Sequence, residues 1–221
     1  MDAIFIIIFG LLVGSFLNVV IYRSPLDLSI VFPRSKCVIC GVRIKWFDLI
    51  PVLSWCFLKG KCRQCKSNIS FRYPFIELLT SFLFVSQFIK YRNSFIDDYL
   101  YIIYSFIFIC FLICIAFIDF DFLIIPNKIL FPFWCTGLII NSFSFEETFL
   151  IQSSLYSLFE NLIGSFLIFS LLSFITLIGN FIFKRPLLGM GDVKLFSTLV
   201  VWIGIAGIEC VAILSILIAG F

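Results

Sequence analysis

The sequence predicts an all-α polytopic membrane protein with about six to seven transmembrane helices and a small cytoplasmic loop domain. Its 221 residues are 62% hydrophobic and only 13% charged, so a single soluble core of this size could not bury the apolar surface. Apolar runs long enough to span a bilayer alternate with short charged segments. One longer and strongly basic segment follows the first apolar run.

Histidine is absent from the sequence. Its absence excludes Ser–His–Asp and Cys–His nucleophilic sites and every histidine-ligated metal site. Any catalysis therefore depends on Asp, Glu, Cys, Lys, Tyr or Ser side chains.

The first transmembrane helix is expected at residues 1–22. No positively charged stretch precedes its apolar run, in contrast to a cleaved signal peptide. We therefore expect the helix to be retained and the mature chain to begin near Met1. Small and polar residues recur on one helical face, at Gly10, Gly14, Ser15 and Asn18. Such a face is typical of close helix packing, although Asn18 could instead hydrogen-bond a ligand.

Residues 23–72 form the predicted loop domain. The segment contains only two acidic residues, both Asp, and ten basic residues. The basic residues are Arg23, Arg34, Lys36, Arg43, Lys45, Lys59, Lys61, Arg63, Lys66 and Arg72. An excess of Lys and Arg beside apolar runs marks the cytoplasmic side of a membrane protein. A nucleic-acid surface is the weaker interpretation of the same charges, so no nucleic-acid partner is expected.

Two Cys-x-x-Cys pairs lie in this loop, Cys37 with Cys40 and Cys62 with Cys65. Their spacing is typical of two knuckles that hold one zinc ion in a tetrahedral thiolate site and so stabilise a loop without its own core. Disulfides are the alternative, but a reducing cytoplasm disfavours them. Redox-active thiols are disfavoured because the pairs are matched. Four thiolates leave no open position, so the zinc is expected to be structural.

Five further helices are expected along the rest of the chain. The last of them could be one long span or two short spans. The five helices are placed at about Tyr73–Ile89, Leu100–Ile118, Ile129–Ile140, Leu162–Phe183 and from Val193 onward, with a break near Gly204 and Gly207. The stretch from Leu150 to the start of the fourth of these is expected to lie along the interface. Pro74 is tolerated in a first helical turn. Glu77 could complement the helix dipole there.

Two carboxylates at predicted helix ends, Asp119 and Asp192, carry the functional hypothesis. With the 23–72 loop inside, counting spans places both at the cytoplasmic face, together with Lys128, Lys184 and Arg185, while Glu146 and Glu147 fall outside. Paired aspartates without histidine indicate aspartic-protease chemistry, in which the two groups share one proton. Asp121 is the rival to Asp119.

The glycines beside Asp192 predict the wall of a substrate groove. Gly189 and Gly191 would let backbone approach an extended peptide. Three other interpretations stay open on these residues alone. The motif could be a helix cap beside two unrelated interfacial acids. The aspartates could instead be relay sites of a proton-coupled carrier, or part of a non-catalytic assembly factor whose zinc loop docks a partner.

Seven motifs in register resemble the prepilin peptidase family, the Gly-x-Gly-Asp membrane aspartic proteases. They are Gly14-Ser15-Phe16-Leu17-Asn18 with Arg23 and Pro25, the two Cys-x-x-Cys pairs, Pro51-Val52-Leu53-Ser54-Trp55, Gly60-Lys61-Cys62-Arg63, Ser70-Phe71-Arg72-Tyr73-Pro74 with Glu77-Leu78, Ile118-Asp119 with Ile125-Pro126-Asn127, and Gly189-Met190-Gly191-Asp192-Val193-Lys194-Leu195.

The resemblance implies a bacterial inner-membrane endopeptidase that removes the basic leader of type IV prepilins or type II secretion pseudopilins at the cytoplasmic face. It implies Asp119 and Asp192 as the catalytic pair, in a peptidase core over residues 73–221. It also implies Lys194 as a groove residue beside Gly189 and Gly191. The family continues further after its second aspartate, so a terminal helix is expected to be missing or the sequence to be incomplete.

A second activity is implied by the same resemblance. The family methylates the new amino terminus with S-adenosylmethionine, and this activity is attributed to the Cys-rich region, here residues 23–72. Glu77 matches a carboxylate implicated in methyl transfer. No glycine-rich cofactor motif supports this from the residues alone.

Overall fold

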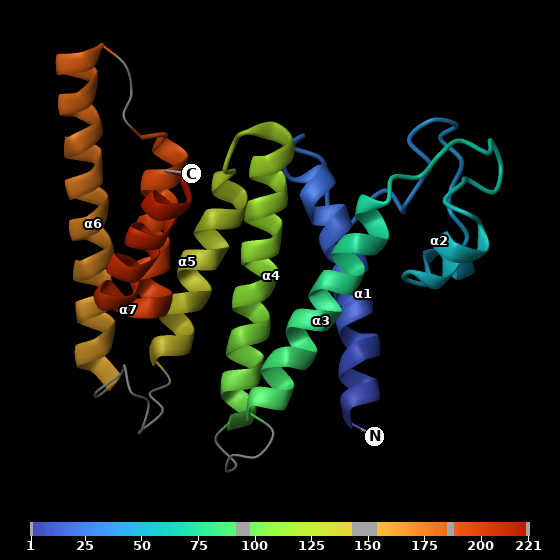
Figure 1. The fold of residues 1–221 in the computed structure, drawn as a ribbon, viewed down its shortest axis with the longest axis horizontal. Coiled ribbons are helices and arrows are strands. Elements are labelled where there is room, and N and C mark those ends of the chain that lie inside the picture. The colour runs from blue at the N-terminus through green and yellow to red at the C-terminus, as the bar shows by residue number, and fades with distance from the viewer. Residues whose placement is uncertain (1, 92–97, 143–153, 185–187, 220–221) are drawn as a thin grey trace. The chain divides into compact units, whose positions relative to one another are not determined.

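The computed structural model describes residues 2–91, 98–142, 154–184 and 188–219, and these residues form helices and loops without strands (Figure 1). The elements are α1 (Asp2–Arg23), the 3₁₀ helix η1 (Trp46–Leu49), α2 (Leu53–Phe57), α3 (Arg72–Tyr91), α4 (Asp98–Phe122), α5 (Asn127–Ser142), α6 (Ser154–Phe183) and α7 (Met190–Ala219). The predicted all-α class is confirmed. The chain forms two compact units, Met1–Leu123 and Ile124–Phe221.

Three of the described helices are long and apolar enough to cross a bilayer, with spans at Asp2–Arg23, Tyr101–Phe122 and Leu158–Ile182. A shorter apolar helix covers Asn127–Ile140. The chain is therefore a multi-pass membrane protein. The count of six to seven spans stays a prediction. Arg185, Glu146 and Glu147, which entered the predicted topology, lie outside the described residues.

In the first unit, α1 packs closely against α3 through its glycines. A Cβ atom at Gly10 would lie 2.6 Å from the Cα of Ser81, and one at Gly14 would lie 2.7 Å from the Cα of Glu77. The two backbones can approach this far only because neither glycine has a side chain. The predicted packing face on the first helix is therefore confirmed. Its alignment also sets Glu77 opposite Gly14.

The other side of α3 packs against α4. The rings of Phe84 and Phe106 stack with centroids 3.9 Å apart. Ile76 and Ile118 are fully buried near the opposite end of this interface. Apolar side chains therefore hold α4, and with it Asp119, in a defined position in the first unit.

In the second unit, α7 packs against α5 through Trp202. Its indole N–H donates a 2.9 Å hydrogen bond to the carbonyl of Phe133 and its ring lies against Gly137. Further along, Gly204 leaves the helical conformation with a φ of 71°, which interrupts α7. The left-handed region costs glycine little. The expected break near Gly204 is therefore confirmed.

The predicted start of the helix at Leu162 is wrong. In the structure α6 already runs from Ser154 to Phe183 as one helix. No Gly or Pro lies between Ser154 and Leu162 to break it. The expected interfacial segment from Leu150 to residue 153 lies outside the described part of the chain.

Candidate functional site

The four loop cysteines come together in the first unit. The Sγ atoms of Cys37, Cys40, Cys62 and Cys65 all lie within 4.8 Å of one another. The Sγ atoms of Cys37 and Cys65 are 3.8 Å apart, and a tetrahedral site with Zn–S bonds of about 2.3 Å separates its sulfurs by about 3.8 Å. The arrangement of four thiols fits a tetrahedral metal centre. This cluster could therefore hold a metal ion.

Two similar backbone turns build the cluster. Each pair of cysteines begins a turn in which the first cysteine carbonyl accepts a hydrogen bond four residues on, from Gly41 N–H at 2.9 Å and from Lys66 N–H at 3.1 Å. Both donor residues have left-handed φ angles, 70° for Gly41 and 57° for Lys66. Each turn brings the two thiols of its pair close together. This local geometry explains why the Cys-x-x-Cys spacing predicted the cluster.

The turns also prepare the thiols electrostatically. Hydrogen bonds from the backbone N–H groups of Cys40 and Ile39 lower the pKa of Cys37 to about 6. A side-chain hydrogen bond from Ser67 lowers the pKa of Cys65. The Val42 N–H lowers the pKa of Cys40, but desolvation and the neighbouring thiols outweigh it and raise that pKa to about 11. Thiolates are the form that binds metal, so part of the cluster is ready for a cation.

Glu77 is buried in the second turn of α3, next to the packing face of α1. Its Oε2 atom accepts a 2.7 Å hydrogen bond from the backbone N–H of Val52, which precedes α2. The interpretation as a dipole-complementing residue is not supported, because α3 has no acidic residue in its first turn. Glu77 instead joins the loop domain to the membrane helices.

Asn18 lies near Glu77 on the facing helix. Its Nδ2 atom donates to the carbonyls of Gly14 at 3.2 Å and Tyr73 at 3.1 Å. Its Oδ1 atom is buried and has no protein partner among the described residues. The amide thus ties α1 to the first turn of α3, the structural role for Asn18 that the packing face predicted.

Asp119 lies exposed in the last turn of α4. The helix ends just beyond it, where Leu123 N–H donates a 2.8 Å hydrogen bond to the Asp119 carbonyl and Leu123 adopts a φ of 54°. Asp121 differs, because its carboxylate is paired with the guanidinium of Arg72 on α3. Sequence reasoning did not find this ion pair. The carboxylate of Asp121, the rival to Asp119, is therefore engaged in an ion pair with Arg72.

Asp192 belongs to the second unit, in the first turn of α7. A Cβ atom at Gly189 would lie 3.0 Å from the Asp192 Oδ2 atom, so any larger residue there would press on the carboxylate. A Cβ atom at Gly191 would lie 3.4 Å from the side chain of Ile125. The Gly-x-Gly-Asp and Ile-Pro-Asn motifs therefore lie against each other within this unit.

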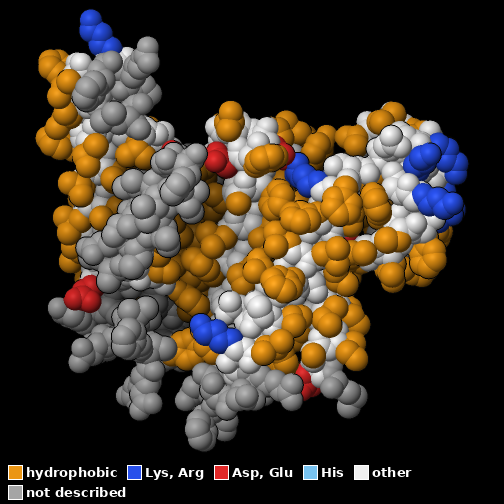
Figure 2. All heavy atoms as spheres, viewed as in Figure 1, with side chains coloured by type: hydrophobic (Ala, Val, Ile, Leu, Met, Phe, Trp, Pro, Cys, Tyr) orange, Lys and Arg blue, Asp and Glu red, His pale blue; other side chains and the backbone are white. Residues whose placement is uncertain are grey.

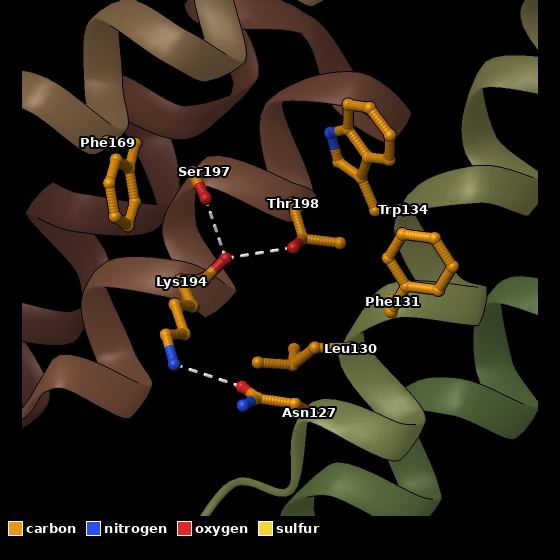
Figure 3. A pocket seen from close by; sticks show the side chains of 8 residues that line it. All are labelled: Asn127, Leu130, Phe131, Trp134, Phe169, Lys194, Ser197 and Thr198. Carbon is orange, nitrogen blue, oxygen red and sulfur yellow. Dashed lines mark hydrogen bonds between the residues drawn. The ribbon is translucent and has the colours of Figure 1, made fainter.

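Lys194 lines a pocket of about 350 Å³ between α5, α6 and α7 (Figure 3). Its Nζ atom donates a 3.0 Å hydrogen bond to the Asn127 side chain at the edge of the pocket. Four further lining side chains are apolar or aromatic, those of Leu130, Phe131, Trp134 and Phe169. The hydroxyls of Ser197 and Thr198, which complete the lining, both donate to the Lys194 carbonyl. The pocket thus combines one cationic side chain with apolar and aromatic lining residues.

Asp119 lies in the first unit and Asp192 in the second, so the structure gives no distance between the two carboxylates. Their pairing therefore stays a prediction. The same applies to the substrate-groove role of Gly189, Gly191 and Lys194, to the role of Glu77 in methyl transfer, and to the functional boundaries at residues 22 and 72.

Fold and sites together define a multi-pass helical membrane protein with a cluster of four cysteines that could hold a metal ion and with aspartates at helix ends. The model of the bacterial peptidase A24 N-terminal domain matches residues 8–91, and that of the type IV leader peptidase family matches residues 106–221. The chain belongs to the type IV leader peptidase family, the relationship that the seven motifs predicted. The curated relatives described next carry the names of enzymes.

Curated relatives cover most of this chain. The prepilin leader peptidase/N-methyltransferase of Bacillus subtilis (strain 168) is 36% identical over 217 residues, which is 96% of this chain and 77% of that protein. The protein of the same name from Myxococcus xanthus (strain DK1622) is 34% identical over 209 residues, 93% of this chain. The chain spans 58% of the length of the Myxococcus relative. No solved structure gave a significant match.

Proposed function

We propose that this chain is a membrane aspartic endopeptidase that removes the leader from type IV prepilins or type II secretion pseudopilins. The proposal rests on family membership and on the names of the relatives, which are prepilin leader peptidase/N-methyltransferases. The site faces the cytoplasm at the inner membrane, because the basic loop of residues 23–72 lies on the cytoplasmic side by its charge.

One observation carries the assignment of the catalytic pair. Gly191, next to Asp192, lies against Ile125 within the second unit. Ile125 is six positions after Asp119, so chain length alone keeps the Cα atoms of these two residues within about 21 Å of each other. Asp119 is exposed and Asp121 is bound to Arg72. Asp119 is thus the carboxylate in that segment available to approach Asp192.

The chemistry follows from two carboxylates that share a proton. The ionised group removes a proton from a water molecule as that water attacks the scissile carbonyl carbon. The protonated group hydrogen-bonds the carbonyl oxygen as negative charge develops there. Proton transfer to the leaving amine then breaks the peptide bond. The pair titrates as a unit, so neither Asp119 nor Asp192 has a permanent acid or base role.

The four-cysteine cluster holds a structural zinc ion in this proposal. Zinc suits four thiolates in tetrahedral geometry, and closed thiolate sites stabilise small loops. The cluster would fix the two turns of the loop domain against each other. All four ligands come from the protein, so the ion takes no part in peptide cleavage.

Amino-terminal methylation is the second proposed activity, supported by the relatives' printed names. S-adenosylmethionine would supply the methyl group when bound. Glu77 would contribute through its position, since it joins the loop domain to α3 by the hydrogen bond from Val52. Loss of this hydrogen bond would weaken the attachment of the proposed methyltransferase region to α3.

Co-expression with a prepilin tests both activities. Asp119→Asn and Asp192→Asn should each leave the substrate at its full length, while Asp121→Asn should shorten it. The mass of the mature product should include one added methyl group with the wild-type chain. Wild-type shortening by Asp119→Asn or Asp192→Asn would contradict the aspartic mechanism. A shortened but unmethylated product would contradict the second activity alone.

A further inference from the structure

An apolar segment interrupts the basic loop domain. Residues 46–58 read Trp-Phe-Asp-Leu-Ile-Pro-Val-Leu-Ser-Trp-Cys-Phe-Leu and contain one charged side chain, that of Asp48. Lys45 precedes the segment, and Lys59 and Lys61 follow it. In a loop that extended into water, these apolar side chains would be exposed without stabilising the fold. An apolar stretch with basic flanks is instead typical of a segment that lies in a membrane interface.

The structure compensates the only charge in this segment. Arg63 donates hydrogen bonds to both oxygens of Asp48, at 2.6 Å from Nη2 to Oδ1 and 2.9 Å from Nε to Oδ2. This bidentate pair lowers the pKa of Asp48, chiefly through the hydrogen bonds. Bidentate Arg–carboxylate pairs are among the stronger ion pairs. The segment therefore presents no isolated negative charge to its surroundings.

The position of α2 along the membrane helices is the main observation. Val52, which precedes α2, donates its N–H to Glu77, and Glu77 lies opposite Gly14 of α1. Nine residues of helix separate Gly14 from the end of α1 at Arg23, a distance of about 14 Å at 1.5 Å per residue. In Figure 1, α2 accordingly lies to one side of α3, below the upper end of that helix.

A second contact keeps α2 beside α3. The Trp55 indole donates a 3.1 Å hydrogen bond to the carbonyl of Ile69. Its ring packs edge-on against Phe71, with centroids 5.7 Å apart. Polar and aromatic contacts thus hold the inner face of α2 against the start of α3. The depth of the segment does not depend on Glu77 alone.

The outer face of α2 is apolar and exposed. Leu53, Cys56 and Phe57, at spacings of three and four residues, share one helical face and are exposed. Phe57 is 84% exposed, and Trp46 in η1 is 79% exposed. In Figure 2, the part of the molecule that projects to the right contains α2. Apolar side chains line its lower edge, and Lys and Arg side chains lie at its outer end.

We propose that residues 46–58 are a monotopic membrane element, with Leu53 and Phe57 in the acyl region of the cytoplasmic leaflet. Its depth along α1, a predicted membrane span, places this face where lipid chains lie. Lys45, Lys59 and Lys61 would reach the phosphates of anionic lipids at the surface. The loop domain is then not wholly cytoplasmic, and Glu77 and Trp55 position the part that enters the bilayer.

Depth-dependent fluorescence quenching tests this proposal on the full chain. Phe57→Trp adds an indole at an exposed position, and its emission is obtained as the difference from wild type. The protein is reconstituted in phosphatidylcholine and phosphatidylglycerol bilayers whose acyl chains carry bromine. Phe16→Trp, at an exposed position on α1, is the matched control for a side chain in lipid.

We expect brominated lipid to quench the added emission of Phe57→Trp to an extent comparable with Phe16→Trp, and aqueous iodide to quench it little. Strong iodide quenching with no effect of brominated lipid would overturn the proposal. Iodide quenching that is relieved by an added prepilin would also overturn it, because the face would then bind peptide. Both aromatic substitutions are conservative, so the comparison does not depend on a damaged fold.

Discussion

Arg72 at the start of α3 is paired with Asp121 near the end of α4, and Asp119, two residues away, is exposed. The ion pair gives Asp121 a structural role between two helices of the first unit. Asp119 is the carboxylate to which we assign the proposed catalytic role. Two acidic residues of similar appearance in the sequence thus have different environments in the fold.

Asp121→Asn should therefore change stability more than activity. Removal of a partly exposed ion pair costs about 1 kcal/mol or less, so we expect a small decrease in thermal stability. Cleavage of a prepilin should continue at close to the wild-type rate. The measurement is a thermal melt beside a cleavage time course, and a large loss of cleavage with an unchanged melt would contradict this role.

Cys37→Ser should remove the metal centre. The four Sγ atoms form one cluster, and loss of one thiolate opens a closed site and weakens binding strongly. Metal analysis of purified protein should find about one zinc ion per wild-type chain and little in the variant. Cys56→Ser is the matched control, because Cys56 is exposed and outside the cluster. Equal zinc content in Cys37→Ser and Cys56→Ser would disprove the assignment.

In metal-free protein, Cys37 should react with iodoacetamide before Cys40. Backbone N–H groups lower the pKa of Cys37 to about 6, whereas the pKa of Cys40 is raised to about 11. The thiolate is the reactive form, so labelling of Cys37 should fall as pH drops through about 6. Fragment-ion mass spectrometry separates the two sites, and added zinc should protect both. Preferential labelling of Cys40 at neutral pH would be inconsistent with these environments.

Gly14→Ala should destabilise the first unit. The new Cβ atom would lie 2.7 Å from the Glu77 Cα and 3.1 Å from the Ile76 carbonyl oxygen, and these are backbone atoms that cannot rotate away. Overpacking of this kind costs about 1–3 kcal/mol. Leu12→Ala, at an exposed position on the same helix, is the control. A thermal melt in detergent should show a lower midpoint for Gly14→Ala than for Leu12→Ala.

The parts of the fold that were predictable from sequence are those with local causes. The cysteine cluster follows from the spacing within each pair and from turns that need only a left-handed residue, such as Gly41. The packing face on α1 follows from helical periodicity at Gly10 and Gly14. The break in α7 follows from the conformational freedom of Gly204.

The contacts that prediction missed join residues far apart in the chain. Glu77 meets Val52 over 25 positions, and Arg72 meets Asp121 over 49 positions. Neither pair belongs to a periodic pattern, so only the packing of α1, α3 and α4 brings them together. The proposed membrane position of α2 depends on the same long-range hydrogen bond between Val52 and Glu77. The sequence did not suggest it, because the basic residues around α2 favoured a wholly cytoplasmic loop.

The rate of prepilin cleavage by Asp119→Asn, Asp192→Asn and the double variant tests the central claim most directly. General acid–base groups typically contribute about 100-fold to 10,000-fold, so each single variant should lose at least about 100-fold. Because the two groups act as a unit, the double variant should be little slower than either single variant. Near wild-type cleavage by either single variant, or losses that multiply in the double variant, would contradict a shared catalytic pair.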